Sequence, residues 1–375
     1  MNAAENALAV LRYQQYDAFP VVCFGWWPET LKKWEDEGHL PAGSADEYAR
    51  LGDNCTADRY AMDKLGFDFG WGYSVSGDMA MRPLFEEKVL RTEEDGSVVK
   101  MDQAGLIVRV VPGVISIPAE IGTALTGREA WEELYLPKLR FTPDRVDTAA
   151  VRAARARADE TGSLLAVYGG SMIGLARNIC GLVGLSYLYA DDRELYCEVV
   201  HTLADLQYRV TEAVLATGVR FDYMHLWEDI ACKSGPLVTP RAFEKIVCPE
   251  YVRITELARR YGLDIVDVDC DGVIDRLVPG WIASGVNTMF PVEVGTWNAD
   301  FVPWREKYGR ELRAVGGMRK HVFAEDKKAV DEEIERLRRL IDLGGYIPCP
   351  DHRIAPDADF SLVAYYCEQM HKLVK

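Results

Sequence analysis

The sequence predicts an α/β fold, and within that class a (β/α)8 barrel preceded by an N-terminal extension. From about residue 160 onward, short β-rich runs alternate with longer segments of helical spacing, which is the order of βαβ units around a parallel sheet. These units number about eight, as in a closed barrel. A doubly wound open sheet is the alternative, and it is less favoured because no GxGxxG motif opens a helix directly after a strand.

The N-terminal part of the chain does not follow this alternation. We interpret residues 1–65 as an extension packed on the barrel, and residues 66–375 as the barrel itself. A strand is expected in the extension at 20–25. The first barrel strands are expected near 67–73 and at 113–120. Between them, 90–110 is predicted to form a hairpin, the one antiparallel excursion, because Glu94-Asp95-Gly96 provides turn chemistry.

The later elements follow in regular order. Strands are expected at 164–171, 221–227, 263–270, 286–292, 312–316 and 345–348. Residues 241–260 and 326–343 place apolar side chains at a spacing of about 3.6 residues, which predicts amphipathic helices. Gly262 and 344–345 follow these helices, where a left-handed cap is expected.

The composition is that of an ordinary globular protein. Among 375 residues, 43 basic and 59 acidic side chains give a formal net charge of −16. Nucleic acids and anionic membranes attract positive surfaces, so neither is expected as a partner. No run reaches the roughly 18 apolar residues that span a bilayer, and the N-terminus lacks the features of a signal peptide. Nine cysteines without a CxxC pair are typical of reduced thiols, so we expect a cytoplasmic enzyme.

Polar residues gather at the ends of the predicted strands, where the catalytic groups of a parallel barrel project from its C-terminal rim. The candidates are His225, Glu228, Asp269, Cys270, Asp271, Glu293, Arg319, Lys320 and His352. Six successive strands end in this way, which indicates an active site more strongly than any one motif does. The P-loop, GxSxG and HExxH motifs do not occur in the sequence.

Each candidate also has a structural interpretation. Glu228 precedes a helix, whose first turn favours a carboxylate. The cluster at 269–271 has more ionisable groups than a helix cap needs, although a buried, inert thiol is the commoner outcome for Cys270. The two basic residues at 319–320 would form a solvated face. Tryptophans are usually core residues, but the adjacent pair at 26–27, followed by proline, is predicted to line a pocket for a flat substrate.

Four stretches of the chain carry a family resemblance, with a weaker fifth at its N-terminus. They are HLWEDIACKSGPLVTPRAFEKIVCPEY (225–251), DVDCDGVIDRLVPGWIASGVNTMFPVEVG (267–295), GGMRKHVFAEDKKAVDEEI (316–334), GGYIPCPDHRIAPDADFSLVAYY (344–366) and FPVVCFGWWPETLKKWEDEGHLP (19–41). They resemble the uroporphyrinogen decarboxylase superfamily, in particular its branch of methyltransferase-like proteins. The decarboxylases of that superfamily bind the carboxylates of their substrate through an arginine-rich N-terminal motif. This chain has Phe24-Gly-Trp-Trp27 there, so an acidic tetrapyrrole is not expected.

The resemblance implies a (β/α)8 barrel that passes a methyl group from a small donor to the cob(I)alamin of a separate corrinoid protein. In such enzymes an H-x-C pair and a later cysteine hold zinc. Asp269 and Asp271 stand at the H-x-C positions, with Cys270 between them as an alternative ligand, and His352 stands near the place of the later cysteine. Together with Glu228, they would form a harder ligand set that zinc still accepts and that suits an ether oxygen.

The resemblance therefore predicts the O-demethylase type, which takes its methyl group from a methoxylated aromatic. An ether has a poor leaving group, so a Lewis acid or a general acid is needed at its oxygen. The acid–base candidates are Glu228, His225 and Glu293, the ring would be held by Trp26, Trp27 and Trp227, and a ring carboxylate would be bound by Arg319 or Lys320. The alternatives are a cofactor-free decarboxylase or lyase acting on a small carboxylic acid, and a ligand-binding barrel without catalysis. A homodimer is implied by the resemblance alone.

Overall fold

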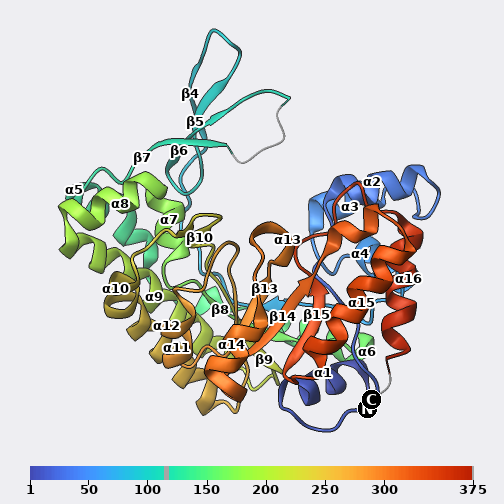
Figure 1. Cartoon of the computed structure of the whole chain (residues 1–375). Coiled ribbons are helices and arrows are strands. Elements are labelled where there is room, and N and C mark those ends of the chain that lie inside the picture. The colour runs from blue at the N-terminus through green and yellow to red at the C-terminus, as the bar shows by residue number, and fades with distance from the viewer. Residues whose placement is uncertain (114–117, 374–375) are drawn as a thin grey trace.

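The centre of the fold is a sheet of seven parallel strands in the order β15-β14-β13-β12-β9-β8-β3, seen in the computed structural model of the chain, which describes residues 1–113 and 118–373 (Figure 1). The strands are β3 (Ser74–Val75), β8 (Ala166–Gly170), β9 (Tyr223–Trp227), β12 (Val266–Asp269), β13 (Thr288–Val292), β14 (Arg313–Met318) and β15 (Tyr346–Pro350). Their spatial order is their order in the chain. This order is typical of a barrel, whereas a doubly wound sheet reverses direction at a switch point.

The N-terminal extension contacts both edges of this sheet. Its strand β1 (Val22–Cys23) pairs in parallel with β2 (Phe69–Gly70), just before β3. Beyond β1, Trp26 forms a parallel bridge with Ile354, which follows β15, and the amide of Ile354 donates to the carbonyl of Gly25 at 2.9 Å. The sheet thus has seven strands in the structure. Closure into an eight-stranded barrel stays a prediction, and the contacts of the extension at both edges are compatible with it.

Helices connect successive strands and cover the outside of the sheet (Figure 1). They are α6 (Thr148–Thr161), α9 (Arg193–Leu215), α11 (Cys248–Arg260), α12 (Val278–Ala283), α14 (Phe301–Tyr308), α15 (Lys327–Ile341) and α16 (Phe360–His371). Val330, Ile334 and Leu337 of α15 are buried, as its 3.6-residue pattern predicts, and Ile341 is half-buried. Gly262 and Gly344 adopt φ of +79° and +71° after α11 and α15, so both predicted caps are confirmed.

The six strands predicted between residues 164 and 348 all occur, but the one predicted at 113–120 is wrong as a barrel strand. Residues 114–117 lie outside the described part of the chain. The rest begins β7 (Ala119–Thr123), which pairs antiparallel with β6 (Leu106–Val110). Ala119, Glu120 and Ile121 are exposed. A short alternating run is therefore compatible with either a half-exposed strand or a barrel strand, and periodicity alone did not separate the two.

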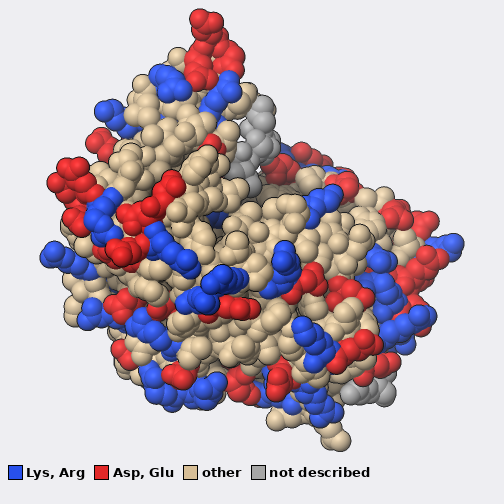
Figure 2. Space-filling model, turned by 60° about the vertical axis from the view of Figure 1, so that its left-hand side comes forward, with Lys and Arg blue, Asp and Glu red and all other residues tan. Residues whose placement is uncertain are grey.

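β7 belongs to an arm that projects from the rest of the molecule (Figure 1). The arm is the antiparallel sheet β4-β5-β6-β7, with β4 (Lys88–Thr92) and β5 (Val98–Met101) forming the predicted hairpin. Acidic side chains gather at its tip, in the β4–β5 turn (Figure 2). The hairpin is not the one antiparallel excursion, because β10 (Ala231–Cys232) and β11 (Gly235–Pro236) form another antiparallel pair directly after β9.

Three helices of the extension pack together, α2 (Pro28–Asp36), α3 (Ser44–Leu51) and α4 (Thr56–Leu65), whereas α1 (Ala3–Leu11) lies away from them against β15 (Figure 1). Arg353, beyond β15, forms a two-pronged ion pair with Asp53, with both N–O distances at 2.8 Å. Such a fork fixes orientation as well as distance, so it ties the loop after β15 to the extension. None of the helices in the described ranges is both long enough and apolar enough to cross a bilayer.

Candidate active site

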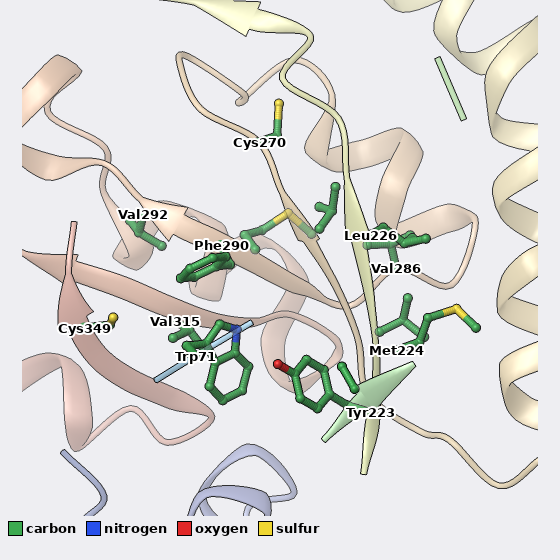
Figure 3. Packing of buried hydrophobic residues seen from close by; sticks show 14 of the residues in the cluster. Trp71, Tyr223, Met224, Leu226, Cys270, Val286, Phe290, Val292, Val315 and Cys349 are labelled. Atoms are coloured by element: carbon green, nitrogen blue, oxygen red, sulfur yellow. The ribbon is translucent and has the colours of Figure 1, made fainter. Parts of the chain in front are cut away.

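Strands β9 and β12 place a histidine and two carboxylates on one face of the sheet. His225 is the register partner of Asp267, and Trp227 is the partner of Asp269. Side chains two residues apart in a strand point to the same face. The indole of Trp71 reaches the same face, where it stacks on Tyr223 with ring centroids 5.0 Å apart (Figure 3).

The deepest polar group is a His–Asp pair. Nδ1 of His225 lies 2.8 Å from Oδ1 of Asp267, and the indole Nε1 of Trp71 donates to Oδ2 of Asp267 at 2.8 Å. Burial lowers the pKa of His225, but the charge and hydrogen bond of Asp267 outweigh it, so the pKa is raised overall. With Nδ1–H bound to the carboxylate, Nε2 has no hydrogen-bond partner among the described residues. The imidazole is therefore oriented and ready to exchange a proton at Nε2.

Asp269 lies one step nearer the rim and is only partly exposed. Its carboxyl makes no hydrogen bond or ion pair with the described residues. Burial raises its pKa well above the ordinary value, the charge of His225 opposes this, and Asp271 and Asp229 raise it further. A carboxyl in this environment favours its protonated form and is able to donate a hydrogen bond to a ligand.

A second histidine–carboxylate pair stands at the rim. Nε2 of His352 is 3.3 Å from Oδ2 of Asp271, and Oδ1 of Asp271 is buried without a partner. The ring of His352 stacks on Trp27, with centroids 5.8 Å apart, and meets the edge of Phe24 at 5.5 Å. His352 immediately precedes Arg353, whose fork to the extension holds this loop in place.

Aromatic rings connect the deep pair to the rim pair. The ring of Phe290, on β13, lies 6.3 Å from the ring of His225 and 4.6 Å from that of Phe24. Phe24 in turn contacts His352. The two histidines thus lie at opposite ends of one aromatic wall. A water-excluding wall of this kind strengthens the electrostatic interactions beside it.

Glu293 supports the rim through the backbone. Its Oε2 accepts a hydrogen bond from the amide of Gly272 at 2.5 Å, and burial, together with the charge of Asp271, raises its pKa. Gly272 has φ of +89°, and a Cβ there would stand 2.6 Å from the carbonyl carbon of Ala231. Glycine is therefore required where β12 ends, so that the chain carrying Asp271 can turn against the β10 segment.

Glu228 is enclosed and lies apart from the other candidates. It has no exposed surface. Its carboxylate accepts from the amides of Met172 (2.6 Å), Ile173 (3.2 Å) and Gly174 (2.8 Å), and from the hydroxyls of Ser171 and Tyr251. These contacts tie β9 to the start of α7 (Gly174–Cys180). Burial raises its pKa, while the hydrogen bond from Tyr251 lowers it.

Three more predicted residues point away from the rim pair. The indole of Trp26 is fully buried in the extension and donates to Asp58 at 2.6 Å. Cys270 is also buried, and its side chain points away from Phe290 (Figure 3). Burial raises the pKa of its thiol well above the ordinary range, so the thiolate is disfavoured. Arg319 faces Glu333, on α15, at 3.7 Å.

Two other predicted residues, Lys320 and Trp227, lie at the carboxyl ends of β14 and β9. The ammonium group of Lys320 donates to the carbonyl of Arg353 at 2.9 Å, and burial lowers its pKa against the opposing charges of Asp351 and Glu293. Trp227 ends β9, and the guanidinium of Arg177 lies over its ring at 5.8 Å.

The predicted zinc ligands do not form a metal site as they are arranged. Among the described residues, no three His, Cys, Asp or Glu side chains are placed to hold one ion. Asp271 and His352 are close enough to share a metal, but Glu228 is surrounded by N–H and O–H donors and Cys270 is turned into the core. Zinc therefore remains a prediction of the resemblance.

Sequence reasoning overlooked the partners of His225. Asp267 lies 42 positions after His225 in the chain, and Trp71 lies 154 positions before it. The signal for Asp267 was present: acidic residues at 267, 269 and 271 alternate with apolar ones, so a strand would point all three to one face. Nothing in the sequence marked Trp71.

Solved structures resemble this chain over nearly its full length. The structure resembles a methyltransferase from Methanosarcina mazei with a TM-score of 0.59 at 13% identity, covering 99% of this chain and 98% of the other. B12-independent methionine synthases from Shewanella sp. W3-18-1 (TM-score 0.49, 12% identity, 95% and 98% covered) and, as a putative enzyme, from Listeria monocytogenes (0.43, 12%, 96% and 100%) are more distant. No protein-family model and no curated protein matches the sequence significantly. The chain thus shares the α/β fold of the Methanosarcina mazei methyltransferase.

Proposed function

We propose that this chain is a methyltransferase that removes the methyl group of a small methoxylated aromatic and delivers it to the cob(I)alamin of a corrinoid protein. The observation that carries the proposal is the His225–Asp267 pair, an oriented imidazole that lies within the neighbouring parallel strands β9 and β12 and whose Nε2 has no hydrogen-bond partner among the described residues. Support also comes from the shared fold with the Methanosarcina mazei methyltransferase. The resemblance of the rim sequences to the methyltransferase-like branch of the uroporphyrinogen decarboxylase superfamily points the same way.

Methyl transfer from an ether needs a proton at the leaving oxygen. The methyl carbon forms a bond to the nucleophile, and the electron pair of the broken C–O bond stays on the oxygen. His225, whose pKa is raised, gives its Nε2 proton to that oxygen, so a neutral phenol leaves rather than a phenolate. When bound, the corrinoid of the partner protein would supply the nucleophile.

Two carboxyls assist His225 in different ways. Asp267 holds the Nδ1–H and stabilises the imidazolium, which fixes the ring with Nε2 toward the substrate. Trp71 neutralises none of this charge but holds Oδ2, so the carboxylate cannot rotate away. Burial raises the pKa of Asp269, which favours the neutral carboxyl that would donate a hydrogen bond to the same ether oxygen.

The decarboxylase alternative requires a cation at the substrate carboxylate. The two predicted cations are occupied otherwise: Arg319 faces Glu333, and Lys320 donates to a backbone carbonyl. Nε2 of His225, by contrast, has no hydrogen-bond partner among the described residues and is available to a substrate. We therefore favour methyl transfer.

The test is methylation of cob(I)alamin by the purified protein with a panel of methoxybenzenes, followed by the absorbance change of the corrin. His225→Gln is expected to lower the rate by about 100-fold or more, the usual contribution of a general acid. His201→Gln is the matched control, because His201 lies on α9 with about half of its side chain exposed. Equal rates for His225→Gln and the wild type would overturn the role of His225. Absence of turnover with every ether would overturn the proposed function.

A further inference from the structure

We propose that the methyl donor binds in a cavity beneath the arm and that this donor is an uncharged, apolar methyl ether without a carboxylate. The inference rests on the proposed function only for the reaction that the donor undergoes. The place and charge of the ligand follow from the cavity itself, so they can be tested by binding alone.

The cavity has a volume of about 540 Å³, within the usual range of small-molecule pockets of about 300–1,000 Å³. The loop after β3 provides Met79, Met81 and Leu84, and α7 provides Leu175 and Ile179. The β5–β6 turn of the arm, at 102–104, closes it on another side. Flexible methionine side chains adapt to the outline of a ring and make favourable sulfur–aromatic contacts.

Tyr168 connects this cavity to the proposed proton donor. It lines the cavity, it is the register partner of His225, and the two ring centroids are 6.2 Å apart. Its hydroxyl has no hydrogen-bond partner among the described residues. His225 does not itself line the cavity, so Tyr168 is the residue through which a donor with its methoxy group toward β8 would approach the imidazole.

The aromatic wall on the opposite side offers no comparable space. The cavity that adjoins Phe24 and Trp71 has a volume of about 30 Å³, enough for a water molecule but not for an aromatic ring. The ring of the substrate is thus assigned to the cavity beneath the arm. Trp27, predicted to hold the ring, stacks on His352 instead.

The charge of the lining sets the substrate class. No lysine, arginine or histidine occurs among the described residues that line the cavity. Its two acidic residues are already engaged: Asp102 accepts from backbone amides of its own turn, and Glu87 pairs with Lys100 at 3.0 Å. A substrate carboxylate would lose its hydration here without gaining a counter-charge, which disfavours binding. The cavity therefore selects an uncharged ring.

Binding of two probes by isothermal titration calorimetry tests the inference. The probes are para-methoxytoluene, which is neutral, and para-methoxybenzoate, which has the same ether with a carboxylate. We expect the neutral probe to bind at least about tenfold more tightly. Ala80→Trp, which fills the cavity, should weaken that binding at least about tenfold. Ala42→Trp is the matched control, since Ala42 is also exposed but lies in the extension, outside the cavity.

A gain-of-binding variant keeps the test independent of folding defects. Leu84 lines the cavity and is 43% exposed, so Leu84→Arg places a cation at its mouth without burying it. This variant should bind para-methoxybenzoate more tightly than the wild type does. Equal affinity of the wild type for both probes, no binding of either, or no effect of Ala80→Trp would each overturn the inference.

Turnover separates this inference from the function on which it rests. Binding of the neutral probe that Ala80→Trp abolishes, without any methyl transfer, would refute the methyltransferase and keep the cavity as a ligand site. Methyl transfer that Ala80→Trp leaves unchanged would keep the methyltransferase and refute the cavity.

Discussion

Replacement of Glu228 by alanine separates a structural role for this carboxylate from the catalytic or metal-binding role that the sequence predicted. The side chain is fully buried and accepts five hydrogen bonds from protein groups, three of them from the backbone at the start of α7. Alanine leaves these three amides without an acceptor. The backbone of Gly174 lies directly against that of Glu228, since a Cβ at Gly174 would stand 2.2 Å from the carbonyl oxygen of Glu228. The substitution therefore acts most directly on this contact between β9 and α7.

The magnitude follows from the amides. An unsatisfied buried donor costs about 1–3 kcal/mol, so three of them cost about 3–9 kcal/mol, and water entering the space lowers this to about 3–5 kcal/mol. Glu228→Gln keeps the volume and one accepting oxygen, so its loss should be smaller, about 1–2 kcal/mol. The free energy of unfolding should fall in the order wild type, Glu228→Gln, Glu228→Ala.

Urea unfolding followed by tryptophan fluorescence measures these differences through the midpoint at constant slope. The methyl-transfer rate is then measured at a temperature where all three proteins are folded. We expect both variants to keep a rate within about threefold of the wild type, since a residue without contact to substrate affects the barrier only indirectly. Wild-type stability combined with a rate lowered more than about 100-fold would refute the structural role and restore Glu228 to the chemistry.

Three other substitutions have defined outcomes. Asp267→Asn removes the charge that raises the pKa of His225, so the alkaline limb of the rate profile, where the imidazolium is lost, should move to lower pH; an unmoved limb would contradict the pair. Burial raises the pKa of Asp58 from 3.8 to about 6, so its carboxyl stabilises the fold only while protonated. From pH 4 to pH 7 the unfolding free energy of the wild type should therefore fall by up to about 3 kcal/mol relative to Asp58→Asn, and a constant difference in urea titrations would refute this. Arg353→Lys replaces the fork to Asp53 by a single contact on a partly exposed pair and should cost about 1 kcal/mol by the same measurement; a larger loss than for Arg353→Met would be inconsistent with an ion-pair role.

The sequence was sufficient for the parallel strands and their helices because each has a period of its own. The helical pattern of α15 and the strand run that became β12 are unambiguous at that level. The prediction at 113–120 failed because a short run of this character fits an arm strand as well as a barrel strand. The arm itself was visible only as a hairpin, since the pairing of β6 with β7 depends on contacts that no local signal encodes.

The position of the candidate residues at or near strand ends could be predicted from the sequence, but their contacts could not. A strand-end carboxylate has the same sequence signature whether it faces the rim, as Asp271 does, or turns back against a neighbouring helix, as Glu228 does. The parity of the strand would have placed Cys270 opposite its two acidic neighbours and so in the core. The pairing of His225 with Asp267 depends on which strands are neighbours, and that is a property of the fold.

The most direct test of methyl transfer follows the carbon atom. The protein is incubated with para-methoxytoluene labelled with carbon-13 in its methoxy group and with cob(I)alamin, and the products are analysed by mass spectrometry. A methyltransferase that protonates the leaving oxygen through His225 predicts labelled methylcobalamin and an equal amount of unlabelled para-cresol, both lost in His225→Gln. Label that remains in the ether, or appears in carbon dioxide or formaldehyde instead of methylcobalamin, would contradict it.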